Sequence, residues 1–179
     1  EGGRLAGRDA VRLALAEALL QRLYPSTGEN VASLPGAARF TAAAYTVIAV
    51  HVALPQETQG RLVDSWRFQL DDRWESPFFA GITSQAEPLT LHRAELAARI
   101  TAEHIYRLEG AETLLALLLE VSTTDSWDML FQAHLNRSTL GLEREAAAWI
   151  GTEDANAIEP DKLNQAPASL SNPTWEPSR

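Results

Sequence analysis

Two histidines and two glutamates lie in one predicted helix, residues 88–108, and come closer to a catalytic pattern than any other segment. A zinc peptidase helix places two histidines one turn apart with a glutamate beside them, so that metal and base share a face. Here His92 and Glu95 are followed by Leu96, and Glu103-His104 has no second histidine at the required offset. We therefore expect no catalytic residue, no metal site and no cofactor.

The charged residues of this segment instead follow the pattern of a solvated helix face. Glu95, Arg99, Glu103 and Arg107 alternate in sign at a spacing of four residues, which stabilises an isolated helix by about 0.2–0.5 kcal/mol per pair. With His92, the first three lie within roughly 80° of one another on a helical projection. The pattern predicts an exposed face opposite an apolar stripe.

Two other histidines are candidates for a binding site. His51 lies in an otherwise apolar segment, where an imidazole costs free energy unless it is hydrogen-bonded. It is either a satisfied core histidine or a functional group with perturbed chemistry. His104 lies at the edge of the apolar stripe of its helix, and we expect it to be half-buried.

Aromatic residues are concentrated between positions 66 and 79. Trp66 and Trp74 share a helix face with Leu62 and Leu70, which predicts packing, and the alternative is a groove for a carbohydrate, peptide or apolar ligand. The candidate ligand-binding residues are therefore Trp66, Trp74, Phe78, Phe79, His51 and His104.

Composition excludes several classes of function. The chain has 179 residues and a formal net charge of -9, and without a basic patch it would be repelled by nucleic acid. It has no cysteine, which excludes disulfides, thiol nucleophiles and iron–sulfur clusters. The longest apolar stretch, 40–54, is shorter than the ~20 residues that cross a bilayer, so no membrane insertion by this segment is expected.

Hydrophobic periodicity and capping residues predict a mainly α protein with a single globular domain. Seven helices are expected. Six cover about 9–24, 37–54, 56–74, 88–108, 111–121 and 138–150, and a short one, capped within Thr123-Thr-Asp125 or by Ser126, runs to about 135. The first places Val11, Leu15, Ala18, Leu19 and Leu23 on one face. The segments 37–54 and 111–121 are apolar nearly all round and are predicted to be central. A buried strand over 45–52 is the alternative, disfavoured because no second strand is evident.

Residues 1–151 are expected to form this helical domain. Residues 152–179 are rich in proline, asparagine and serine and lack periodicity, which predicts an extended or flexible tail. The chain begins at Glu1 without an initiator methionine, which indicates a processed or trimmed piece of a longer protein.

One segment resembles a known family. The leucine-rich run after Gly110, the Ser126-Trp-Asp-Met-Leu-Phe helix start, and the later Glu145 and Trp149 resemble the helical C-terminal part of gluzincin-like (peptidase MA type) domains of bacterial extracytoplasmic proteins. The resemblance covers residues 110–150 and implies an extracytoplasmic or membrane-anchored parent protein. The His-Glu-x-x-His metal helix of that family is absent, so peptidase activity is not implied.

These observations favour an acidic, soluble, non-catalytic helical domain that serves interaction or ligand binding, with an unknown protein or small molecule as partner. The alternative is a hydrolase related to metallopeptidases, with a site assembled from distant histidines and acids. Only the folded chain can bring such residues together.

Overall fold

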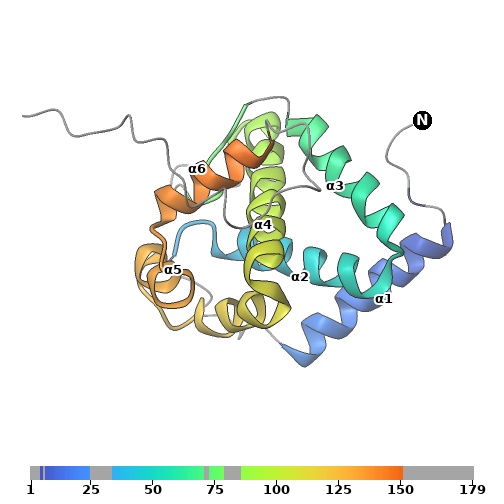
Figure 1. The fold of residues 1–179 in the computed structure, drawn as a ribbon, viewed down its shortest axis with the longest axis horizontal. Coiled ribbons are helices and arrows are strands. Elements are labelled where there is room, and N and C mark those ends of the chain that lie inside the picture. Colours follow the sequence, from blue (N-terminus) through green and yellow to red (C-terminus); the bar gives the residue numbers. More distant parts are fainter. Residues whose placement is uncertain (1–4, 6, 25–33, 71–72, 79–85, 151–179) are drawn as a thin grey trace, which may run out of the picture.

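The structure is a computed structural model that describes residues 5, 7–24, 34–70, 73–78 and 86–150. These residues form six helices and contain no strand. The helices are α1 (Gly7–Leu23), α2 (Ala37–Ala53), α3 (Gln56–Leu70), α4 (Pro88–Glu120), α5 (Trp127–Leu135) and α6 (Thr139–Ile150). The long α4 runs through the middle of the bundle, and α1 lies at its edge (Figure 1). The mainly α prediction is confirmed, and the strand alternative for 45–52 is wrong because these residues belong to α2.

Helix α2 begins at a position that only glycine fits. Gly36 has φ of 75°, and a Cβ atom built there would lie 2.0 Å from the carbonyl oxygen of Pro77. Three residues later, Arg39 Nη1 donates to the same oxygen at 2.7 Å. The helix ends at Ala53, and Leu54 after it is extended because the following Pro55 disfavours the helical region. These contacts fix the start of α2 against the segment that precedes α4.

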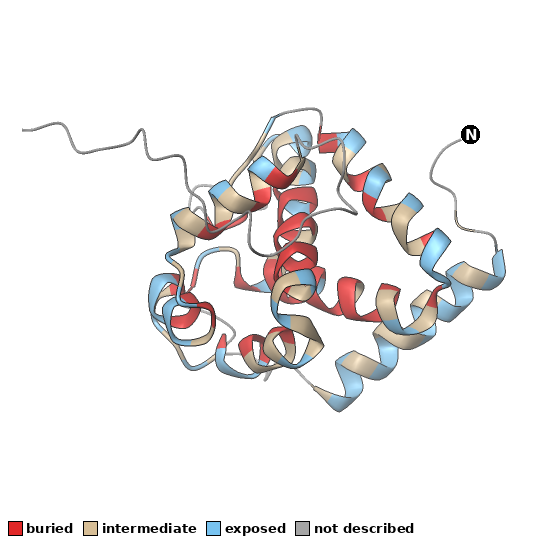
Figure 2. Ribbon diagram, viewed as in Figure 1, coloured by how far each residue is buried: buried red, intermediate tan, exposed pale blue. Residues whose placement is uncertain are grey.

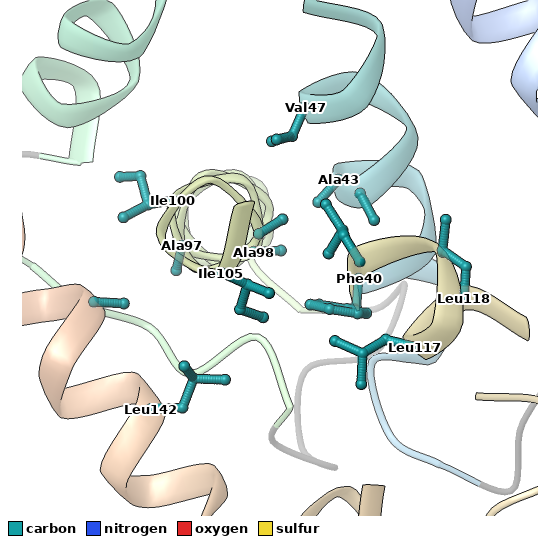
Figure 3. Close-up of a cluster of buried hydrophobic side chains, with 14 of the residues drawn as sticks. Phe40, Ala43, Val47, Ala97, Ala98, Ile100, Ile105, Leu117, Leu118 and Leu142 are labelled. Carbon is teal, nitrogen blue, oxygen red and sulfur yellow. The ribbon is translucent and has the colours of Figure 1, made fainter. Parts of the chain in front are cut away.

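The core lies mainly between α2 and α4. Small side chains such as Ala43 and Ala98 face one another across this contact and let the two helices approach closely, while Phe40 and Ile105 fill the space beside them (Figure 3). Leu142 of α6 is buried on another side of α4. The core is therefore built around α2 and the first half of α4.

This arrangement differs from the predicted one. Residues 88–120 form one element with a kink at Gly110, where φ is 85°, so the predicted count of seven helices is not confirmed for the described residues. The prediction that 111–121 is a second central helix is not confirmed either. Leu114 and Leu117 are buried there, but Leu119 is 59% exposed. Because the chain turns at the glycine, only one side of this second half faces the core.

Helix α3 is shorter than predicted. It ends at Leu70, and the segment 73–78, which includes Trp74, is not helical. Its buried positions Val63, Trp66 and Leu70 pack against the core. The predicted tail 152–179 lies outside the described residues.

The last two helices begin at polar caps. Ser126 Oγ accepts from the backbone N–H of Met129 at 3.4 Å at the start of α5. At the start of α6, Ser138 Oγ accepts from Gly141 N at 3.1 Å, and Asp128 accepts from Thr139 N at 2.6 Å. Of the caps predicted for α5, Ser126 is the one observed, and the helix start predicted at Ser138 is confirmed. Helices α5 and α6 are joined at this point.

Candidate functional site

A buried carboxylate joins α2 to α4. Both oxygens of Glu103 are occupied: His51 Nε2 lies 2.8 Å from Oε2, and Arg107 Nε donates to Oε1 at 2.7 Å. The Glu103 side chain is fully buried, whereas the side chains of His51 and Arg107 are 14% and 30% exposed. Tyr106 stacks on the His51 ring, with 4.0 Å between centroids and 11° between planes. We call these four residues the Glu103 cluster.

The prediction that Glu103 lies on a solvated face is wrong. The i,i+4 spacing does pair Glu103 with Arg107, but the carboxylate turns inward because His51 approaches from α2. Burial by itself would raise the pKa of Glu103, yet the hydrogen bonds and charges of His51 and Arg107 outweigh it and lower that pKa. The carboxylate is therefore ionised when the chain is folded at neutral pH. Next to it, burial and the charge of Glu103 raise the pKa of Tyr106.

A second cluster surrounds the neighbouring residue, on the α6 side of α4. His104 is 2% exposed, so the expectation of half burial is wrong, and its ring lies 5.9 Å from that of Trp149. His104 Nε2 is 3.6 Å from Glu145 Oε2, too far for a hydrogen bond, and it has no hydrogen-bond partner among the described residues. Glu145 is instead bonded to Arg137 Nε at 2.8 Å.

The environment of His104 disfavours its charged form. Burial lowers the pKa of His104, with the nearby arginines Arg137 and Arg107 acting in the same direction and Glu145 opposing them. Arg107 also lies over Trp149, with its guanidinium carbon 5.2 Å from the ring centroid. It thus links the two clusters.

The sequence pointed to His51 and His104, and both do lie in polar clusters at the contacts of α4. It placed Glu103 and Arg107 on a solvated face, and it did not point to Tyr106. The one signal for Glu103 was indirect: an imidazole inside an apolar helix requires a partner, and only folding reveals which one. A carboxylate that orients one nitrogen of a histidine is a typical arrangement for a base. No group of three or more His, Asp or Glu side chains in the described part of the chain could hold a metal ion.

The aromatic candidates do not meet at one place. Trp66 is 4% exposed and carries Arg99 over its ring at 6.0 Å. Phe78 is 7% exposed and packs against Trp127 at 4.6 Å between centroids. Trp74 is partly buried at the margin of the core, and Phe79 lies outside the described residues.

Phe78 does border an open pocket of about 560 Å³ between α5 and α6, which neither Trp66 nor Trp74 lines. Its two carboxylates have structural partners already. Asp128 caps α6, and Glu143 accepts a hydrogen bond from Ser76. Burial raises the pKa of Glu143, and the bond from Ser76 opposes that rise. These two carboxylates therefore join α6 to α5 and to the segment 73–78.

The outer face of α1 is the other unusual surface. Its large aliphatic side chains are spaced four residues apart and are all at least half exposed: Val11 68%, Leu15 60%, Leu19 51% and Leu23 70%. We call these four residues the outer ridge. The helix has no buried residue, and Figure 2 shows it in the colours of exposed and intermediate residues only.

Helix α1 is held by its opposite side. Leu13, Leu20 and Tyr24 are partly buried and pack on the core, and the Tyr24 carbonyl accepts a hydrogen bond from the hydroxyl of Tyr45 in α2. The helix is therefore apolar on two sides. The predicted face with Val11, Leu15, Ala18, Leu19 and Leu23 exists, but it faces away from the core.

None of the described helices is both long and apolar enough to span a membrane. The chain has no significant match to any family model, to any curated protein or to any solved structure. The function must therefore be argued from the geometry.

Proposed function

We propose that this chain is a non-catalytic helical domain that binds a protein partner through the outer ridge of α1. The observation that carries the proposal is the alignment of four large aliphatic side chains on one helix face, each at least 51% exposed. Single exposed leucines are ordinary on protein surfaces, whereas an aligned apolar patch marks an interaction site. Amphipathic helices commonly bind partners through anchors at this spacing.

The apolar surface of the outer ridge is large enough to contribute to the binding of a partner. Burying one fully exposed Leu or Val side chain contributes about 1.5–3 kcal/mol. Because these four are 51–70% exposed, covering them would contribute roughly 4–7 kcal/mol before the costs of association. Those costs are about 4–15 kcal/mol, so the face supports a modest affinity on its own. The free energy is unused in the chain as described, because the same four side chains face outward.

The experiment is site-specific photo-crosslinking in cells of the source organism. Benzoylphenylalanine is placed at position 15 or 19, and the matched control is position 68, because Phe68 is 86% exposed on α3 and already aromatic. We expect a discrete crosslinked protein from positions 15 and 19 and none from position 68. The captured protein, purified, must then bind the domain, and Leu15→Gln/Leu19→Gln must weaken its binding at least about tenfold.

Equal crosslinking at all three positions, or none at 15 and 19, would contradict the proposal. Retained affinity of the captured protein for the double variant would do the same. The extracytoplasmic setting implied by the resemblance of residues 110–150 belongs to this proposal too. Fractionation of cells of the source organism tests it: recovery of the protein outside the cytoplasm supports this setting, and recovery in the cytoplasm contradicts it.

A hydrolase remains the second candidate, and the observation that favours it is the 2.8 Å contact between His51 Nε2 and Glu103 Oε2. A buried carboxylate that orients a partly exposed imidazole is the base–orienter half of a catalytic site. The test is hydrolysis of ester and peptide substrates by wild type and His51→Gln. Turnover by wild type that is lost in a folded His51→Gln variant would support this candidate, and turnover equal in both would exclude His51 as its base.

A further inference from the structure

On the outer face of α1, a row of large side chains lies beside a row of small ones, as on helix surfaces that pack against another helix. The outer ridge follows the row of positions four apart, and the adjacent row is formed by the smaller residues Ala10, Ala14 and Ala18, which are also exposed. A raised aliphatic row beside a low alanine row is the geometry in which the ridge of one helix fits the groove of another. A flat apolar patch would not select a helix in this way.

The charges on this face have one sign. Arg8, Arg12 and Arg22 are all exposed, and on a helical projection they fall within roughly 100° of Val11, the first residue of the outer ridge. The two acids of the helix, Asp9 and Glu17, are only partly exposed and project toward the other side. Asp9 contacts Arg12 at 3.5 Å and so offsets part of one charge. The face is therefore basic on a chain whose net charge is -9.

We infer that the partner presents an amphipathic helix whose aliphatic ridge is flanked by carboxylates. This inference rests on the proposed function and names the chemistry of the partner. The aliphatic ridge of the partner would lie in the alanine row of α1, and its carboxylates would pair with the three arginines. Arginine suits this role because its planar guanidinium binds carboxylates through two parallel hydrogen bonds.

A second copy of this chain does not complement the face. In an antiparallel pair centred on Glu17, Val11 meets Leu23 and Leu15 meets Leu19, but Arg12 meets Arg22, so like charges oppose one another. A membrane surface is also a poor match. The exposed face of α1 has no aromatic side chain to lie in the lipid interface.

Two designed helical peptides test the inference with the intact domain. They carry the same leucine ridge and differ only in the flanking positions, which are all glutamate in one and all lysine in the other. By fluorescence anisotropy at low salt, we expect the acidic peptide to bind at least about tenfold more tightly than the basic one. Added salt should weaken the binding of the acidic peptide, because these exposed pairs are screened.

Two variants locate the binding site. Leu15→Gln/Leu19→Gln should abolish binding of the acidic peptide. Arg8→Gln/Arg12→Gln/Arg22→Gln should remove its advantage over the basic peptide. Circular dichroism of each variant checks that α1 is still helical, and because all five side chains are exposed, no loss of fold is expected.

Each other outcome overturns the inference. Equal binding of both peptides would show an apolar docking face without charge selection, which leaves the proposed function intact. Absence of binding, or binding that survives the leucine changes, would refute the acidic helix as partner. Concentration-dependent dimers in sedimentation, or binding to anionic vesicles in place of the peptide, would assign the face to a second copy or to a membrane. Only the crosslinking result at positions 15 and 19 decides the proposed function itself.

Discussion

Helices α1 and α2 have the same length of 17 residues, and both are rich in alanine and aliphatic side chains, but their burial is opposite. Ten residues of α2 are buried, and none of α1 is. The difference comes from composition and position together. Helix α1 has five Arg, Asp or Glu residues and α2 has one. Helix α2 packs against α1, α3 and α4, whereas α1 packs mainly against α2 at the edge of the bundle (Figure 1). Apolar composition thus sets how much a helix can bury, and its neighbours decide how much it does bury.

The centre and the edge of the molecule also differ in the kind of side chain that they bury or expose. Glu103 is fully buried in the centre of the molecule, while Leu15 and Leu23 are at least 60% exposed at its edge. The carboxylate is stable there because the side chains of His51 and Arg107 each form a hydrogen bond with one of its oxygens. The leucines are stable at the edge because exposure costs a folded chain nothing relative to the unfolded one. Ion pairs and hydrogen bonds therefore hold the α2–α4 contact in the centre, whereas the outer ridge of α1 is exposed and can contact a partner.

The largest expected effect is that of Glu103→Ala, which removes the buried carboxylate at the α2–α4 contact. We expect it to lower the free energy of unfolding by about 3–5 kcal/mol, because it leaves His51 and Arg107 without their buried counter-charge. Urea denaturation measures this. Glu57→Ala is the control, since Glu57 forms a similar pair with Arg61 but is 83% exposed, and it should cost less than about 1 kcal/mol. Equal effects of the two changes would show that the buried pairing is not what stabilises the α2–α4 contact.

A second prediction compares two leucines in the same half of α4. Leu117 is fully buried, so Leu117→Ala should lower the free energy of unfolding by about 2–5 kcal/mol. Leu119 is 59% exposed, and Leu119→Ala should change it by no more than about 0.5 kcal/mol. The same denaturation experiment measures both. A loss below about 1 kcal/mol for Leu117→Ala would place this half of α4 at the surface.

The third prediction concerns the pH dependence of the centre. Burial lowers the pKa of His104, so the unfolded chain binds a proton there more readily than the folded chain does. Its contribution to stability is complete above the ordinary histidine pKa of about 6.5 and is lost as pH falls below that value. We expect the melting temperature to fall between about pH 7 and pH 5, and this fall to be smaller in His104→Leu.

His92→Gln is the control for this titration, since His92 is exposed and outside both clusters. It should leave the pH dependence unchanged. An unaltered pH profile in His104→Leu would mean that burial of this imidazole does not control stability in that range. The lowered pKa of Glu103 acts in the same direction at more acidic pH, as its carboxylate becomes protonated.

The smallest expected effect is on the outer ridge. Leu15→Gln/Leu19→Gln should change the free energy of unfolding by no more than about 0.5 kcal/mol per substitution, because both side chains are already exposed. On the opposite side of the same helix, Leu20 packs on the core, and Leu20→Ala should cost clearly more. A large loss from the outer pair would show that these leucines are covered within the chain, which would contradict the contrast between edge and centre.

The amino-acid sequence by itself determined the mainly α class and most helix positions. Glycines, prolines and polar caps act locally: Pro55 ends α2, Ser126 caps α5, and Ser138 precedes α6. These signals depend on the backbone of a few neighbouring residues, so they can be recognised without knowledge of the fold.

Only the tertiary structure decided which face of each helix is inside. Helix α1 is apolar on two sides, so its sequence could not say whether Leu15 or Leu20 packs on α2. Glu103 fits a solvated i,i+4 series equally well in sequence, and its burial depends on His51, which lies 52 positions earlier in the chain. Periodicity reports the faces of a single helix, whereas burial and pairing depend on neighbours that are distant in sequence, and folding alone brings those together.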